Sequence, residues 1–347
     1  ALNNNSLKVC FITGHQKPKK CGITDYVNLL SDELTKHGHQ AKIIEIKSPK
    51  DFDYRNKNLP KADLYSLQFA PYLFSPKGLS GRFLFSFGAI LRNRLTHINF
   101  HEIWVGAYPR ASCKEKLWGW RQKREILKFL KISNPNLITT TNIAAMDRLK
   151  KQGISAKYLY LFGNIPQSKY KQFFDSKYIK VVFFGTLYDK FPYEQLGVKL
   201  DKISDLTNQP IKLCLIGRQR ENNGLKQLIH VARKHGFSVL EKGELPINLI
   251  SNELQLSDVG ISTTPYDVIG KSGTTAAMLE HRLPTLAYDD GDTPQINLII
   301  PKQLKDHIFL INDHSSVEKL LLYIEKPRKS FFDGVAHTAN KMLELVS

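Results

Sequence analysis

The chain has 347 residues, of which 42% are hydrophobic and 24% are charged, enough for two globular domains with sizeable cores. Its formal net charge of +18 predicts an anionic partner: a nucleic acid, an anionic membrane surface or a phosphorylated small molecule. The sequence has no apolar run of the roughly 18 residues that a membrane span needs. Its first five residues do not have the pattern of a signal peptide, and from the sequence we expect a cytoplasmic protein.

Residue spacing disfavours two further classes of site. The four cysteines are scattered without the spacing of metal ligands, so we expect neither a zinc site nor a disulfide framework. No nucleic-acid-binding motif is present, and no element interleaves basic and aromatic residues into a base-stacking platform. Nucleic acid is therefore less favoured than the other two anionic partners.

Strands and helices alternate along the first half of the chain, a pattern that predicts a parallel sheet. Apolar, β-branched runs predict strands at 8–13, 41–46, 63–69, 98–100, 136–140 and 156–161. Apolar residues at helical spacing predict helices at 23–37, 79–95, 114–130 and 143–152. The polar, aperiodic stretch that follows predicts a linker at 166–178.

The alternation then restarts. We expect strands at 179–185, 211–217, 238–240, 259–264, 283–288 and 308–311, and helices at 193–206, 223–235, 246–255, 272–281, 315–325 and 331–345. The sequence thus predicts an α/β fold of two Rossmann-like domains, 1–165 and 179–325, facing across a cleft. Residues 326–347 are expected to form a terminal helix, whose return to the first domain is left open. Ligands of such sheets bind beyond the carboxyl ends of the strands.

The stretch Gly270-Lys271-Ser272-Gly273-Thr274 opens a short helix directly after a buried strand. Its small and hydroxyl-bearing residues leave backbone N–H groups accessible at the helix N-terminus, and its lysine adds a positive charge. The stretch therefore predicts an anion site, such as one for a nucleotide diphosphate. An ordinary strand–loop–helix unit with a solvated lysine is the alternative.

Glu280 lies eight residues after Ser272 and is placed to accept hydrogen bonds from the hydroxyls of a ribose. A Walker A loop is excluded, because the glycine it requires five positions before Gly270 is replaced by Pro265.

Other polar residues follow predicted strands. His101 and Glu102 come directly after the strand at 98–100, a common position for functional residues, although a core histidine is a fair alternative. Arg218 follows another strand and is predicted to pair with a diphosphate, with a solvated loop arginine as the alternative. The other candidates in such turns are Gly22, Trp104, Gly185 and Thr186.

Together these features resemble the GT-B glycosyltransferases, and most closely the retaining family-4 type. Four motifs carry the resemblance over most of the chain: Cys21-Gly22-Ile23-Thr24-Asp25-Tyr26-Val27, Phe100-His101-Glu102, the strand ends Phe183-Phe184-Gly185-Thr186 and Leu215-Ile216-Gly217-Arg218, and Ser272 to Glu280. The last is similar to the family's E-x7-E helix, whose second glutamate binds the donor ribose. The chain departs from that pattern at Ser272, where the family has its first glutamate, and at Thr186, where it has arginine.

The resemblance implies sugar transfer from a nucleotide-sugar donor to a glycan, lipid-linked or protein acceptor, with retention and without a metal or other cofactor. It implies donor binding by Gly22, Gly185, Thr186, Ser272, Gly273, Thr274 and Glu280, catalysis by His101, Lys271 and Arg218, and acceptor-side roles for Glu102 and Trp104. A catalytically silent subunit of the same fold and a basic nucleic-acid-binding protein are the alternatives. The helix at 79–95, which mixes arginines with large apolar residues, is a candidate for docking on an anionic membrane, with burial in the first domain as the other interpretation.

Overall fold

The computed structural model describes residues 6–14, 22–46, 59–107, 111–169, 177–219, 221–289 and 300–347. Cys21 and residues 170–176 of the predicted linker therefore lie outside the described residues. The chain divides into two compact units, one made of 1–160 with 335–347 and the other of 161–334.

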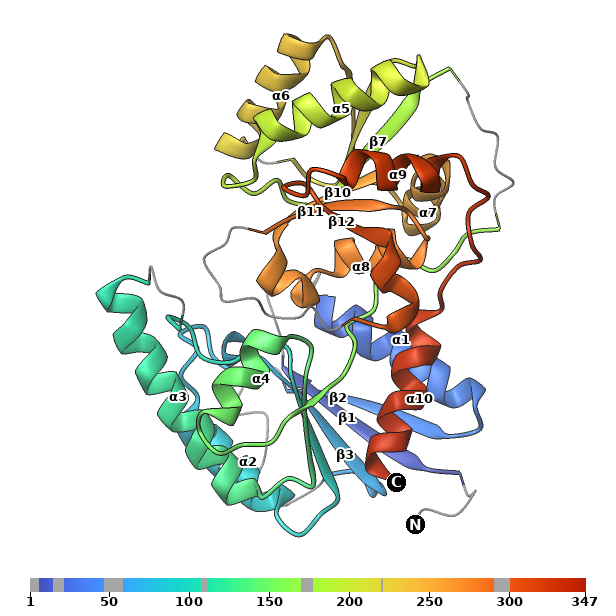
Figure 1. The fold of residues 1–347 in the computed structure, drawn as a ribbon. Helices are drawn as coiled ribbons and strands as arrows, with labels where there is room; N and C mark the ends of the chain where they lie inside the picture. The colour runs from blue at the N-terminus through green and yellow to red at the C-terminus, as the bar shows by residue number, and fades with distance from the viewer. Residues whose placement is uncertain are drawn as a thin grey trace. The chain divides into compact units, whose positions relative to one another are not determined.

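In the first unit, six described strands form a parallel sheet in the order β2-β1-β3-β4-β5-β6 (Figure 1). The strands are β1 (Lys8–Gly14), β2 (Gln40–Ile46), β3 (Leu64–Phe69), β4 (Thr96–Phe100), β5 (Leu137–Thr140) and β6 (Lys157–Tyr158). The helices are α1 (Gly22–Lys36), α2 (Gly81–Leu91), α3 (Cys113–Ser133), α4 (Ile143–Lys150) and α10 (Gly334–Val346). The last of these belongs to this unit through its residues from Val335 onward, and its Thr338 hydroxyl donates a hydrogen bond to the Tyr160 carbonyl.

The second unit repeats this plan with a parallel sheet in the order β12-β11-β10-β7-β8-β9. Its strands are β7 (Ile179–Phe184), β8 (Ile211–Ile216), β9 (Ser238–Gly243), β10 (Val259–Pro265), β11 (Thr285–Tyr288) and β12 (Ile308–Leu310). Its helices are α5 (Tyr193–Thr207), α6 (Asn223–His235), α7 (Ile247–Leu256), α8 (Gly273–Glu280) and α9 (Ser316–Ile324). The predicted α/β fold of two Rossmann-like units is therefore confirmed.

The helix predicted at 79–95 is shorter than expected, and the structure supports burial among the two interpretations that the sequence left open. The helix ends at Leu91, because Asn93 takes a left-handed conformation with φ 66°. Its large apolar residues Phe83, Leu84 and Phe87 are at most 3% exposed and pack in the core of the first unit. They are not available to a membrane, so burial is the correct interpretation. Within the described ranges, no helix combines the length and apolarity that crossing a membrane requires.

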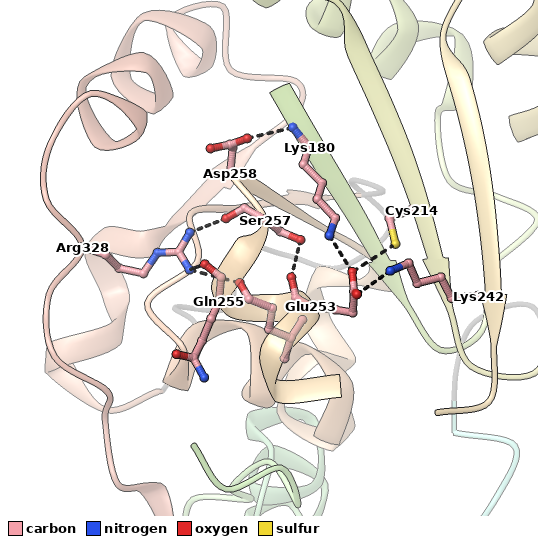
Figure 2. A network of polar contacts seen from close by, with 9 residues as sticks. Lys180, Cys214, Lys242, Glu253, Gln255, Ser257, Asp258 and Arg328 are labelled. Carbon is pink, nitrogen blue, oxygen red and sulfur yellow. Dashed lines mark hydrogen bonds and ion pairs between the residues drawn. The ribbon is translucent and has the colours of Figure 1, made fainter. Parts of the chain in front are cut away.

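A polar network holds the second unit together (Figure 2). The carboxylate of Glu253, on α7, pairs with the ammonium groups of Lys180 on β7 and Lys242 on β9. Burial opposes ionisation of Glu253, but the hydrogen bonds from both lysines outweigh it and lower the pKa of this carboxyl group. Nearby, the guanidinium of Arg328 donates to the carbonyl oxygens of Leu254, Gln255 and Ser257 and so satisfies the end of α7.

Candidate functional site

The loop between β10 and α8 is built to leave backbone donors accessible. Ser272 is the N-cap of α8, and its hydroxyl accepts a hydrogen bond from the N–H of Thr275 over 3.2 Å. The N–H of Ala276 bonds the Ser272 carbonyl. The N–H groups of Gly273 and Thr274, which precede these, have no intrahelical acceptor in any α-helix. They are therefore the donors that an anion at this N-terminus would use.

These donors border a cavity of about 250 Å³ in the second unit. Six of the predicted site residues line it: Gly185, Thr186, Lys271, Ser272, Gly273 and Thr274. They come from two places, the carboxyl end of β7 and the start of α8, and the carboxyl end of β10 closes the cavity between them. The structure thus brings together residues separated by more than eighty positions in the sequence.

A chain of hydroxyl groups fixes the wall of this cavity. The Ser262 and Thr275 hydroxyls lie 2.7 Å apart, and the Ser272 hydroxyl lies 2.8 Å from that of Thr275. On the other side, the Thr263 hydroxyl donates to the Thr186 carbonyl over 2.9 Å and accepts from the N–H of Tyr188. Because every hydroxyl in this chain has a protein partner, the helix N-terminus is held in place before any ligand arrives.

Glycines at the ends of β7 and β8 allow a close approach to this wall. Gly185 and Gly217 have φ values of 91° and 100°, which other residues rarely adopt. A Cβ atom added to Gly185 would lie 3.0 Å from Cγ2 of Thr274, inside the cavity wall. By contrast, a Cβ added to Gly273 would meet nothing within 4 Å, so this position faces open space.

Two predicted residues of the second unit do not line the cavity. Arg218 is exposed, and its guanidinium lies 3.4 Å from the carboxylate of Glu244. Glu280 ends α8 and is only 2% exposed, and its carboxylate accepts a hydrogen bond from the N–H of Gly163 over 2.6 Å. The backbone carbonyl of Glu280 also accepts from the N–H of Phe332. This glutamate therefore connects α8 to Gly163 and Phe332, which lie near the two ends of the second unit.

In the first unit, His101 lies at the carboxyl end of β4, as predicted, and is 7% exposed. Its Nε2 lies 2.7 Å from Oε1 of Gln68, an atom that only accepts hydrogen bonds. Nε2 must therefore carry the proton, which leaves Nδ1 as an acceptor. Burial lowers the pKa of His101 to about 4, so the ring is neutral at physiological pH.

A second histidine, His97, was not singled out in the sequence. It belongs to the same network of buried hydrogen bonds as His101. Its Nε2 lies 2.7 Å from the Thr139 hydroxyl, which donates onward to Oδ1 of Asn99, and its Nδ1 lies 2.9 Å from the Ser66 hydroxyl. Burial, with a smaller contribution from His101, lowers the pKa of His97 to about 3. The signal in the sequence was the alternation of polar residues along two apolar strands, which puts them on one face of the sheet.

The remaining predicted residues of the first unit lie apart from this network. Glu102 is exposed, and Trp104 is buried with the ammonium of Lys123 5.7 Å from its ring. Gly22 begins α1, and a Cβ atom added there would meet nothing within 4 Å. Among the described residues, no three His, Cys, Asp or Glu side chains gather closely enough to hold a metal ion.

No protein-family model and no curated protein sequence matches this chain. Solved structures do match it over nearly its full length. Alr3699/HepE of Anabaena, in complex with UDP and glucose, is 13% identical with a TM-score of 0.51 and covers 97% of this chain and 98% of its own. AviGT4, a glycosyltransferase involved in avilamycin A biosynthesis, is 13% identical with a TM-score of 0.53, over 98% of this chain and 97% of its own.

A putative UDP-N-acetylglucosamine 2-epimerase from Listeria monocytogenes is similar to the same extent. It is 10% identical with a TM-score of 0.52 and covers 98% of this chain and 95% of its own. At such identities the likeness shows the fold and leaves the reaction open. The chain has the GT-B fold, as the sequence motifs implied, and the resemblance to the retaining family-4 type stays a prediction.

Proposed function

We propose that this GT-B chain transfers a sugar from a nucleotide-sugar donor to an acceptor, and that the donor diphosphate binds in the cavity at the N-terminus of α8. The observation that carries the proposal is the cavity itself. Gly273 and Thr274 with their backbone donors, the positive end of a helix dipole and the basic residue Lys271 all border one space of about 250 Å³. This combination suits a group with several negative charges.

The chemistry of the leaving group explains why such a site would accelerate transfer. As the bond between the anomeric carbon and the diphosphate oxygen breaks, its electron pair stays on the diphosphate and the sugar becomes oxocarbenium-like. The N–H groups of Gly273 and Thr274 are already oriented by the hydroxyl chain around Ser272. Preorganised donors stabilise the developing charge without rearrangement, and removing one such group typically costs roughly 10²–10³ in rate.

We propose retention of anomeric configuration, with attack of the acceptor hydroxyl on the face that the diphosphate leaves and transfer of its proton to the departing phosphate. No metal is required in this scheme, because Lys271 and the helix N-terminus supply the positive charge. A neutral His101, with Nε2–H bonded to Gln68, is suited to accept a hydrogen bond on Nδ1 from a sugar or acceptor hydroxyl. It need not act as a general base.

Three further assignments are part of this proposal. Arg218 contributes to diphosphate binding once it exchanges Glu244 for the ligand, and Glu280 contributes to the ribose site. Gly22 is assigned to the donor phosphates, and Glu102 and Trp104 to the acceptor side. The acceptor is a glycan, a lipid-linked molecule or a protein. Ser272 stands where the family pattern has a glutamate. It caps α8 with its hydroxyl and is one of the residues that line the cavity.

A panel of UDP-, GDP-, ADP- and dTDP-sugars tests the proposal, with the release of nucleoside diphosphate and the fate of the sugar both followed. A UDP-sugar is the first choice, because Alr3699/HepE was solved in complex with UDP-glucose. Slow release of diphosphate and free sugar in the absence of acceptor supports a transferase. Interconversion of sugar epimers would instead indicate an epimerase, like the Listeria neighbour. Binding of the nucleotide-sugar without turnover would indicate a catalytically silent subunit.

Two variants make this test specific to the cavity. A Cβ atom added to Gly273 would meet nothing within 4 Å, so we expect Gly273→Val to be accommodated by the fold and to abolish release of diphosphate. Asn223→Val is the control, because it also puts a valine at the first residue of a helix, here α6. Release that is unaffected by Gly273→Val would contradict the location of the site.

A further inference from the structure

The outward side of α3 carries a continuous stripe of exposed residues. Positions three or four apart along a helix lie on one face, and the residues at this spacing are all exposed in the structure. We define the α3 outer face by this stripe: Lys114, Leu117, Arg121, Arg124, Lys128 and Lys131. At a rise of 1.5 Å per residue, the stripe extends for about 26 Å along the helix and drifts gradually around it, by roughly 20° every seven residues.

The opposite side of α3 is fixed against the first unit, so the stripe cannot turn inward. Ile126 and Phe129 are buried, and a Cβ atom added to Gly88 of α2 would lie 3.1 Å from the Phe129 ring, which places the two helices side by side (Figure 1). A Cβ atom added to Gly119 would lie 1.8 Å from the carbonyl oxygen of Val105. The helix is therefore seated by close contacts.

The α3 outer face carries positive charge only. The two acidic residues of α3 are engaged elsewhere: Glu115 forms a capping box with Ser112, and Glu125 accepts a hydrogen bond from the N–H of Ser80. Among the described residues, no ion pair is formed by any of the five basic residues of the stripe. Like charges at this spacing destabilise a helix, so folding alone does not favour the arrangement.

Large apolar side chains are exposed within this charge. Leu117 is 55% exposed, and Trp120, next to Arg121, is 52% exposed. The guanidinium of Arg124 lies 4.8 Å from the Trp120 ring centroid, so the indole is placed at the level of the charged groups. Indole and guanidinium side chains with this arrangement are typical of the boundary between lipid headgroups and acyl chains.

We propose that the α3 outer face docks the protein on an anionic lipid bilayer, with Leu117 and Trp120 inserted below the headgroups and the basic residues against lipid phosphates. Charge complementarity selects an anionic surface. The apolar pair selects lipid over nucleic acid, because Leu117 offers nothing to a phosphate backbone, whereas it gains from burial in a bilayer. This surface is independent of the cavity at α8, and the inference does not rest on the proposed function.

The experiment measures binding of the full chain to vesicles of phosphatidylcholine alone and of phosphatidylcholine mixed with phosphatidylglycerol. Anionic vesicles should bind the protein and neutral vesicles should not. The chain has three tryptophans, Trp104, Trp118 and Trp120, and only Trp120 is exposed. Brominated acyl chains should therefore quench fluorescence on binding, and Trp120→Phe should remove most of that quenching.

Two pairs of variants assign the binding to this face. Lys114→Glu/Arg121→Glu should weaken binding to anionic vesicles by roughly 25-fold or more, since each basic residue near such a surface contributes about 1 kcal/mol, a factor of about five. Its control is Lys226→Glu/Arg233→Glu, an exposed pair on α6 with the same spacing and charge change, which should bind as the parent does.

Leu117→Ala/Trp120→Ala should also weaken vesicle binding, whereas Val198→Ala/Leu206→Ala, exposed apolar residues on α5, should not. Circular dichroism establishes that each variant is folded. Equal binding to neutral and anionic vesicles, or binding that all four variants retain, would overturn the proposal. Salt-sensitive binding to duplex DNA without quenching by brominated lipid would replace the bilayer with a nucleic acid.

Discussion

Replacement of Glu280 separates a structural role of this carboxylate from a ligand-binding role. A carboxylate that only binds the ribose, the role assigned to Glu280 from the sequence, could be removed by Glu280→Ala with little loss of fold. In the structure Glu280 is 2% exposed and accepts a hydrogen bond from the N–H of Gly163 over 2.6 Å. Alanine would leave that N–H buried without an acceptor and create a cavity, for a combined loss of about 2–4 kcal/mol.

Thermal unfolding measured with and without a nucleoside diphosphate tests this expectation. In a domain of this size each kcal/mol lowers the melting temperature by roughly 2–4 °C. Glu280→Gln keeps the volume and one oxygen acceptor, so it should lose only about 1 kcal/mol and remain folded. If Glu280 also binds the ribose, the stabilisation by nucleotide should shrink in the glutamine variant.

The control is Glu318→Ala, which removes an exposed carboxylate paired with Lys202 and should leave the melting temperature unchanged. A Glu280→Ala variant that melts at the temperature of the parent would refute the structural role. An unchanged nucleotide response in Glu280→Gln would argue against the ribose assignment.

Three other predictions follow from the same geometry. Gly185→Ala should destabilise the second unit by about 1–3 kcal/mol and weaken nucleotide binding, because a φ of 91° strains any other residue and the added Cβ would press on Thr274. Denaturant unfolding measures the stability and nucleotide titration the affinity, and parental values in both would contradict the prediction. Because burial lowers the pKa of His97 to about 3 and of His101 to about 4, the contribution of these two rings to the free energy of unfolding should be constant well above pH 6.5. It should fall at lower pH, by up to about 1.4 kcal/mol per pH unit for each histidine, and a flat profile down to pH 4 would contradict the buried neutral rings. Lys271→Ala should lower kcat/KM by roughly 10²-fold or more while nucleotide affinity changes less, and steady-state kinetics that stay within about threefold of the parent would refute the assignment.

The sequence predicted the fold well because buried parallel strands are short apolar runs between amphipathic helices. It also indicated six of the residues that line the α8 cavity, since glycines at strand ends and an N-cap serine are local signals. The sequence left two interpretations of the helix at 79–95 open, because its partner, α3, contributes Phe129 from far along the chain. A single helix does not show which of its faces another element covers.

Glu280 and His97 illustrate what local patterns omit. The acceptor role of Glu280 depends on Gly163, which is 117 residues away, and no spacing rule indicates it. His97 is neutral because it is buried, and its partners Ser66 and Thr139 lie on the neighbouring strands, so its role appears only once the strand register is known. Such long-range satisfaction of buried polar groups is a property of the folded chain.

Titration calorimetry of the Gly273→Val variant tests the central claim most directly. The ligand is whichever of UDP, GDP, ADP and dTDP stabilises the parent most, and Asn223→Val is the control. We predict that valine weakens binding at least about tenfold, because it adds a side chain to a residue that lines the cavity and whose added Cβ would meet no protein atom within 4 Å. The control should bind as the parent does. Equal affinity of the parent and Gly273→Val would show that the diphosphate does not bind at the N-terminus of α8.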